Sequence, residues 1–186
     1  AGTVSGGYDQ RTGLGGDAVW LISYPDGRRC VIEACGAAAG QATRALYDTA
    51  GHTTIPWRGG LAANSMAGAV SGWQEALRQS ARLQPNLPLQ DLLRDATYYA
   101  EQGYAVSDSE AALLREKQAE LATNPAFMAA YAGADSLVAH GDIRRTPAFG
   151  RTLRQLAEQG LDSFYPRPLP PALRADLAES GRPLPP

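Results

Sequence analysis

Two cysteines, Cys30 and Cys35, are the only thiols in this 186-residue sequence, and they stand five positions apart. No histidine or further cysteine lies near enough to complete a zinc-type ligand spacing, so we expect no structural metal site. If both lie on one strand, their odd separation points them to opposite faces, which argues against a disulfide between them. We therefore expect two buried, unpaired thiols.

A nucleophile with a neighbouring base would indicate hydrolysis through a covalent intermediate. The two histidines, His52 and His140, stand in linker-like segments, and no serine or cysteine has the context of a nucleophile elbow. Ser71 lies between Val70 and Gly72 within a predicted helix, where packing explains it better than nucleophilic chemistry. The sequence therefore predicts no catalytic triad in this chain.

Glycines 13, 15 and 16 raise the question of a phosphate-binding loop, because glycine-rich turns can direct backbone N–H groups at an anion. Such a loop should follow a strand and open a helix, whereas these glycines precede a predicted strand. We expect the segment from Thr3 to Asp17 to be a loop whose backbone packs closely against other backbone.

Other polar and aromatic residues fit structural roles. The carboxylates Glu75, Asp91 and Asp95 suit exposed helix faces and show no sign of an acid–base pair. Helical spacing and the absence of positive charge make the aromatic residues core or subunit-contact residues rather than a platform for bases. These aromatic residues are Trp57, Trp73, Tyr98, Tyr99 and Tyr104.

Composition is typical of a folded globular chain, with 44% hydrophobic residues and a formal charge of -2. This charge supplies no reason to expect nucleic acid or a membrane surface as partner. The first residues do not show the basic-then-apolar layout of a signal peptide, and no apolar run is long enough to span a membrane. Both a cytoplasmic and a periplasmic location agree with this pattern.

The elements that would position these side chains begin with a hairpin. Residues Ala18 to Tyr24 and Arg29 to Ala34 are β-prone runs that flank the turn sequence Pro25-Asp26-Gly27. Their apolar runs are nearly continuous, which is typical of strands covered on both faces. Because two strands are not stable alone, their sheet neighbours must come from elsewhere.

The rest of the chain is mainly helical. Ser107 and Glu110 form the pattern of a capping box. Thr146 is expected to cap the helix that opens with Pro147. The segment from His52 to Ser65 is expected to be irregular. We expect one partial domain over residues 1–186. The expected helices are Gln41 to Ala50, Gly68 to Leu83, Pro88 to Gln102, Asp108 to about Ala122, Pro125 to Tyr131, Thr146 to Gln159 and Leu169 to Glu179.

Read in order, five segments resemble the large subunit of γ-glutamyltranspeptidases, members of the N-terminal-nucleophile hydrolases. The resemblance extends from about Gly13 to Gly181, and Ala67 replaces the proline that is usual in the third segment. The five segments are Thr12 to Ile22, Val31 to Thr43, Leu61 to Trp73, Leu87 to Ser107, and Thr152 to Tyr165.

This resemblance implies a precursor that cuts itself, so that a threonine becomes the N-terminus of a small subunit and its amine serves as base for its own hydroxyl. The chain would be the partner of that small subunit and would hold no catalytic residue itself. It also implies a small-molecule amide substrate and no metal or organic cofactor. The expected fold is α+β, mostly helical with a hairpin near the N-terminus, and part of a four-layer αββα sandwich.

The resemblance places Cys35 where the family commonly has an arginine that pairs with the α-carboxylate of the γ-glutamyl group. A thiol cannot make this bidentate pair. Relatives of a second type carry an arginine just after this point, where this chain has Gly36. We expect Cys35 and Gly36 to line the substrate pocket.

The resemblance thus favours a γ-glutamyltransferase or hydrolase that acts on a γ-glutamyl-type amide. Two alternatives remain open. The assembly is an acylase for a non-glutamyl, β-lactam-type substrate, or the chain is a non-catalytic scaffold subunit.

Overall fold

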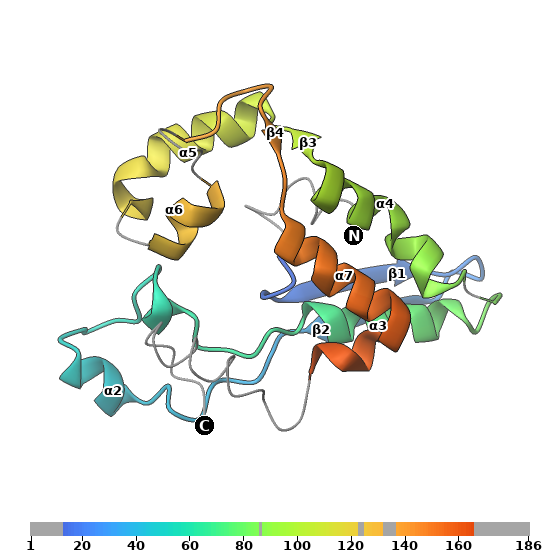
Figure 1. The fold of residues 1–186 in the computed structure, drawn as a ribbon. Coiled ribbons are helices and arrows are strands. Elements are labelled where there is room, and N and C mark those ends of the chain that lie inside the picture. Colours follow the sequence, from blue (N-terminus) through green and yellow to red (C-terminus); the bar gives the residue numbers. More distant parts are fainter. Residues whose placement is uncertain (1–12, 86, 123–124, 132–136, 166–186) are drawn as a thin grey trace. The chain divides into compact units, whose positions relative to one another are not determined.

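The computed structural model describes residues 13–85, 87–122, 125–131 and 137–165, which form two compact units. The hairpin unit comprises the described residues of 14–85 together with 161–165. The helical unit comprises the described residues of 87–160. Figure 1 shows the elements of both units in chain order. The helix predicted at Leu169 to Glu179 lies outside the described residues.

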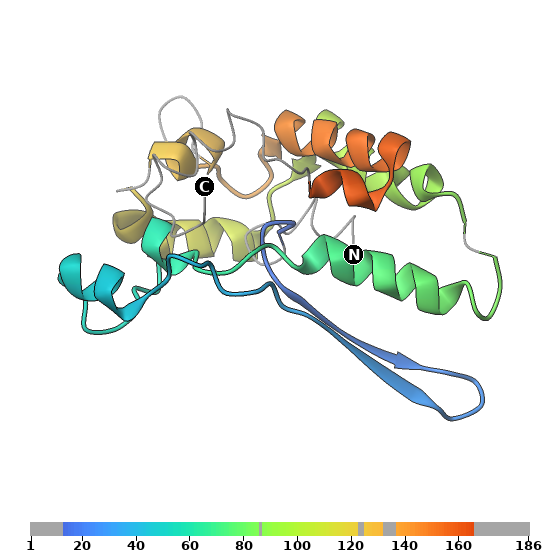
Figure 2. The same ribbon diagram turned by 90° about the horizontal axis from the view of Figure 1, so that it is seen from below.

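The hairpin unit begins with β1 (Ala18–Ser23) and β2 (Arg29–Ala34), which pair antiparallel as the predicted hairpin, with Ala18 opposite Ala34 and Ser23 opposite Arg29. The Gly27 N–H donates to the Tyr24 carbonyl at 3.0 Å, and the backbone at Gly27 has a φ of 86°. Glycine adopts this left-handed conformation without steric cost, which explains its place in the turn. Figure 2 shows the two strands as a ribbon that ends in this turn.

Only one face of this ribbon is covered within the hairpin unit. Helix α3 (Ala69–Ser80) contacts both strands. At Gly72 the helix lies close to the strands, because a Cβ there would be 2.7 Å from the Cβ of Ala34. The opposite face exposes Val19, Leu21 and Val31, each more than 60% accessible. The nearly continuous apolar pattern thus predicted two apolar faces, and the described residues of this unit cover one of them.

Three shorter elements complete the hairpin unit. Helix α2 (Arg44–Thr49) starts later than the predicted Gln41 because the Thr43 side chain caps it by accepting the Leu46 N–H. The segment predicted to be irregular contains one turn of 3-10 helix, η1 (Gly60–Ala62). A second such turn, η2 (Leu161–Phe164), packs against α3.

The helical unit is built on two packed helices, α4 (Leu89–Gln102) and α7 (Pro147–Gln159). Each buries an apolar stripe and ends at a glycine with positive φ, Gly103 or Gly160. The stripes consist of Leu93, Ala96 and Ala100 on α4, and of Gly150, Leu153 and Leu156 on α7.

Helix α5 (Asp108–Leu121) begins at the predicted cap, where the Ser107 side chain accepts the Glu110 N–H. The reciprocal half of the capping box was predicted wrongly. The Glu110 carboxylate instead receives Arg144 Nη1 at 2.7 Å and the Tyr104 hydroxyl at 3.2 Å. A buried arginine competes better for this carboxylate than a cap N–H does, because the pair neutralises both charges.

The ion pair connects α5 to a small sheet. Strands β3 (Tyr104–Ala105) and β4 (Ile143–Arg144) pair antiparallel, so that both partners of Glu110 come from this sheet. Helix α6 (Pro125–Tyr131) lies where predicted, and the Tyr131 ring centroid is 3.7 Å from the Arg144 guanidinium carbon. Arg144 therefore ties three separate elements together.

One further cap prediction was wrong. Thr146 precedes α7, but its side chain makes no capping bond. Its backbone N–H donates to the Ala100 carbonyl at 2.8 Å, which draws the residue toward α4. Tertiary contact thus decides this helix start. Across the ranges that the structure describes, no helix has the length and apolar character needed to cross a bilayer.

Candidate functional site

The predicted substrate-binding residues lie where the chain leaves the hairpin. Strand β2 ends at the buried Ala34, and Cys35 follows as an exposed residue. Farther on, Ala38 forms an isolated bridge with Ser65, and the Ala37 carbonyl accepts the Met66 N–H at 3.0 Å. Cys35 and Gly36 thus form a short connection between two stretches of paired backbone.

Gly36 is held between a side chain and another stretch of backbone. Its N–H donates to Asp17 Oδ1 at 3.0 Å. A Cβ at this position would lie 1.6 Å from the Met66 carbonyl oxygen, so the connection tolerates only glycine here. The close approach of segment 64–66 therefore explains the residue type at Gly36.

The glycine-rich segment packs against the start of α3, as predicted. The Gly16 carbonyl accepts the N–H groups of Gly68 and Ala69, each at 3.0 Å. A Cβ at Gly68 would meet the Ala34 carbonyl oxygen at 2.1 Å. These contacts occupy backbone groups at the helix N-terminus with protein partners, and this supports the packing interpretation over an anion site.

Tyr165 closes the same region from η2. Its hydroxyl donates to the Ala67 carbonyl and accepts the Ser71 N–H, both at 2.9 Å. The Ser71 hydroxyl donates to the Gly68 carbonyl at 2.7 Å. Ser71 thus has the helix role predicted for it.

Both cysteines are unpaired, as predicted, but the prediction that they are buried was wrong. Cys30 is half-buried and Cys35 is exposed. Cys35 lies past the end of β2 and is not part of the alternating strand pattern. Partial desolvation raises the pKa of the Cys35 thiol, and the carboxylates of Asp17 and Glu33 raise it further. The thiol is therefore neutral near pH 7, and its surroundings carry negative charge.

Other candidate groups are engaged elsewhere. Glu75 pairs with Arg78 at 2.6 Å, and Arg94 lies 3.4 Å from Asp95 and 3.9 Å from Asp91. His140 contacts Asp108 at 3.2 Å. Among the residues with described positions, no three His, Cys, Asp or Glu side chains cluster so as to hold a metal ion.

The aromatic residues divide between core and surface. Trp73 is buried on α3, whereas Trp57 and Tyr98 are 79% and 60% exposed. The exposed rings leave the predicted subunit-contact role open for these two residues.

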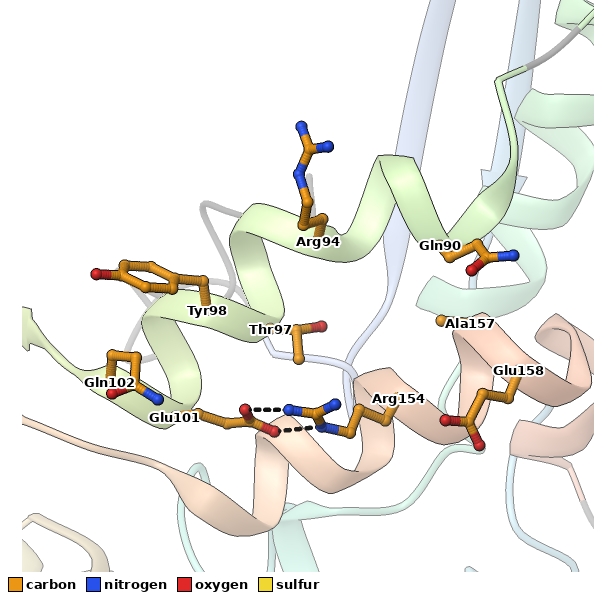
Figure 3. A pocket seen from close by; sticks show the side chains of 9 residues that line it. All are labelled: Gln90, Arg94, Thr97, Tyr98, Glu101, Gln102, Arg154, Ala157 and Glu158. Atoms are coloured by element: carbon orange, nitrogen blue, oxygen red, sulfur yellow. Dashed lines mark hydrogen bonds and ion pairs between the residues drawn. The ribbon is translucent and has the colours of Figure 1, made fainter.

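A polar groove of about 430 Å³ lies in the helical unit, along α4 and α7 (Figure 3). Two of its lining side chains, Glu101 of α4 and Arg154 of α7, point toward each other and form a bidentate pair. Its lining includes neither Cys35 nor Gly36. The lining residues are Gln90, Arg94, Thr97, Tyr98, Glu101, Gln102, Arg154, Ala157 and Glu158.

Sequence reasoning assigned no role to Asp17 or Tyr165. Both stand in segments that carry the family resemblance, at the end of the glycine loop and at the end of the last segment. Their side chains act through contacts with residues 19 and 98 positions away. Such distant contacts leave no local signal in the sequence.

Comparison with known proteins identifies the family. The family model described as gamma-glutamyltranspeptidase matches residues 7–184. The oxamate amidohydrolase proenzyme of Klebsiella pneumoniae is 44% identical over 178 residues, which are 95% of this chain and 33% of that protein. The glutathione hydrolase-like YwrD proenzyme of Bacillus subtilis is 27% identical over 175 residues, which are 94% of this chain and 32% of that protein.

Solved structures show the same fold. The γ-glutamyltranspeptidase of Helicobacter pylori matches with a TM-score of 0.85 at 20% identity, over 98% of this chain and 52% of that chain. A cephalosporin acylase from Bacillus halodurans matches with a TM-score of 0.79 at 24% identity, over 93% of this chain and 32% of that chain. The predicted α+β fold, with its hairpin and its place in the N-terminal-nucleophile sandwich, is thereby confirmed.

The chain spans about a third of the length of these two curated relatives. With the family model matched over nearly all residues, the chain belongs to the γ-glutamyltranspeptidase family, in which it corresponds to a portion of the large subunit.

Proposed function

We propose that this chain forms one partial domain, residues 1–186, of the large subunit of a two-subunit amidohydrolase. The nucleophile is the N-terminal threonine of a separate small subunit, produced by cleavage of a common precursor. The threonine hydroxyl attacks the amide carbonyl and the amine leaves, so that an acyl-threonine forms. Water then releases the acid and restores the hydroxyl. Supporting this, several curated relatives are described as proenzymes.

The observation that carries the proposal is the chemistry at Cys35 and Gly36, which we place in the substrate pocket. A neutral thiol beside Asp17 and Glu33 offers a substrate carboxylate no cationic partner. Pairing with a guanidinium is charge-assisted and bidentate, and a thiol replaces neither feature. The wall therefore lacks the clamp for the α-carboxylate of a γ-glutamyl group, and any substrate carboxylate, that of oxamate included, must find its cationic partner on other residues of the assembly.

Among relatives, the name of the Klebsiella pneumoniae protein gives an amidohydrolase of oxamate, a small amide. This similarity supports a small amide as substrate. An acylase is the second candidate, because the Acylase ACY 1 proenzyme of a Pseudomonas strain is 27% identical over 177 residues, or 91% of this chain.

The test is to express the complete precursor and assay the processed protein on oxamate, a γ-glutamyl anilide and an acylated cephalosporin. We expect ammonia release from oxamate and much weaker turnover of the γ-glutamyl anilide. Replacing the small subunit's N-terminal threonine with alanine should abolish turnover while the two chains stay associated. Preferential turnover of the cephalosporin would favour the acylase, and no turnover of any amide would favour a scaffold subunit.

A further inference from the structure

The connection that carries Cys35 and Gly36 has unequal support along its length. On one side, Ala34 pairs with Ala18 at the end of the hairpin. On the other side, the Ala39 N–H donates to the Asn64 carbonyl at 2.8 Å. Between them, the Gly36 N–H is held by a side chain, that of Asp17. Among the described contacts, the Asp17 carboxylate is thus the hydrogen-bond partner that holds the backbone of the candidate pocket wall at Gly36.

Asp17 is well placed for this task. It immediately precedes Ala18, the first residue of β1, so its backbone is fixed by the hairpin. Its preceding residue, Gly16, is fixed in turn by two bonds from the start of α3. A carboxylate on such a rigid backbone holds its partner with little loss of side-chain entropy.

Steric contact with the backbone of Met66 also restrains Gly36. The Met66 carbonyl oxygen lies where a Cβ would project, so Gly36 cannot move toward segment 64–66. Asp17 restrains the same residue through its N–H. Together, the two contacts restrict Gly36, and they restrict its neighbour Cys35 with it.

We propose that Asp17 is a positioning residue for substrate binding: its carboxylate holds the Gly36 N–H and so sets where Cys35 and Gly36 meet the substrate. The proposal rests on the proposed function for the assignment of this pocket wall. Asp17 acts through Gly36 and performs no proton transfer in this role.

The test compares Asp17→Ala and Asp17→Asn in the processed two-subunit protein, with oxamate as substrate. We expect Asp17→Ala to raise KM about tenfold with a much smaller change in kcat, because a hydrogen bond to a charged group is lost from the binding wall. Asp17→Asn keeps an oxygen acceptor without the charge, so its KM should lie between the KM of the wild type and that of Asp17→Ala. An unchanged KM in Asp17→Ala, with only the active fraction reduced, would show a merely structural role and overturn the proposal.

A second readout needs no activity. In a peptide that covers residues 34–37, hydrogen–deuterium exchange of one amide, that of Gly36, should be faster in Asp17→Ala than in the wild type. In Asp17→Asn it should be faster to a lesser degree. Unchanged exchange would sink the proposal, even if oxamate proves not to be a substrate. If oxamate is not turned over but exchange accelerates as expected, the substrate assignment fails and the anchoring contact stands. If Asp17→Ala does not assemble, Asp17→Asn decides, and wild-type exchange together with wild-type KM would overturn the proposal.

Asp26 provides the matched control. Its Oδ1 accepts the Arg28 N–H at 3.0 Å in the hairpin turn, which is the same kind of bond at the same length. Asp26→Ala removes one carboxylate and one such bond from the hairpin unit, together with the exposed ion pair between Asp26 Oδ2 and Arg28 Nε at 2.7 Å. We expect it to leave KM and the exchange of residues 34–37 unchanged.

Discussion

At the scale of single residues, the site is defined by what stands at two neighbouring positions. Cys35 is accessible and neutral, and Gly36 is confined by the Met66 carbonyl. In the proposed pocket, Cys35 determines which chemical group the wall can hold, and Gly36 determines whether the wall forms. These two effects are separable by mutation.

Cys35→Arg should create γ-glutamyl turnover in the processed protein. A guanidinium at this position supplies the bidentate partner for an α-carboxylate, and Asp17 and Glu33 nearby favour its charge. We expect kcat/KM for a γ-glutamyl anilide to rise at least about tenfold, measured by anilide release. Cys35→Ser is the control, since it changes the side chain without adding charge. Equal rates in both variants would contradict the assignment of this position to the pocket.

Gly36→Ala should destabilise the folded assembly by about 1–3 kcal/mol, because the added Cβ meets backbone that has no flexible end to yield. Gly40→Ala is the matched control: it lies in the same segment, and a Cβ there has nothing within 4 Å. We expect Gly40→Ala to change stability by less than about 0.5 kcal/mol. Urea unfolding of both variants checks the difference, and equal midpoints would show that the segment at Met66 moves freely.

At the scale of elements, buried polar contacts join what local pattern leaves separate. Glu110 and Arg144 are 1% and 3% exposed in their side chains and connect α5 to β4. Breaking a buried pair by removing one partner leaves the other charge without compensation. This contact therefore holds the helical unit together beyond its apolar packing.

Glu110→Ala should cost about 3–5 kcal/mol of unfolding free energy. Glu116→Ala, on the same helix, removes a carboxylate whose side chain is 66% exposed and should cost less than about 0.5 kcal/mol. Denaturant unfolding of the two variants measures the contrast. A small loss in Glu110→Ala would mean that water or another group replaces the carboxylate.

A second contact network makes the hairpin sensitive to acid. Tyr24 donates to Gln79 Oε1 at 2.9 Å, and Gln79 in turn donates to Glu75. Hydrogen bonds lower the pKa of Glu75 to about 2, with the largest contribution from Arg78 and the next largest from Gln79. Since this pKa is below the ordinary value of 4.5, the carboxylate stabilises the fold at pH above about 4.5.

That stabilisation should disappear as the pH falls from about 4.5 to about 2. Glu75→Gln cannot ionise, so the variant should lose stability less steeply over this interval than the wild type does. Thermal midpoints recorded at several pH values compare the slopes, with Asp95→Asn as control for the loss of one exposed negative charge. Parallel slopes in wild type and Glu75→Gln would contradict the role of this network.

At the scale of the whole molecule, the hairpin presents an apolar face that the described residues of its own unit leave exposed. Val19, Leu21 and Val31 share this face, and Leu21 pairs directly with Val31 across the strands. Exposed strands of this kind also present unpaired backbone groups at their edges. The proposed assembly supplies the natural cover for this ribbon.

The isolated chain should therefore self-associate or bind a hydrophobic dye strongly. Replacing Val19, Leu21 and Val31 with threonine should reduce both effects, because threonine is β-branched and suits a strand while it makes the face more polar. Dye fluorescence and light scattering measure the change. A sharp, reversible melt of the wild-type monomer would contradict this prediction, and it would also weaken the proposed need for a partner subunit.

The sequence by itself determined the elements whose signals are local. Turn residues and β-prone runs predicted the hairpin, Ser107 predicted the start of α5, and Gly103 and Gly160 predicted the ends of α4 and α7. Each of these predictions depends on residues that lie within a few positions of one another in the sequence. The order of five segments also identified the family, since order along the chain is itself a property of the sequence.

Only the tertiary structure decided which partner each polar group takes. Glu110 has the sequence pattern of a cap but pairs with Arg144, which is 34 positions away. Thr146 precedes its helix without capping it, and Asp17 reaches Gly36 across the open end of the hairpin. These contacts form because folding brings distant groups together, and for the buried pair of Glu110 and Arg144 little water competes with the contact.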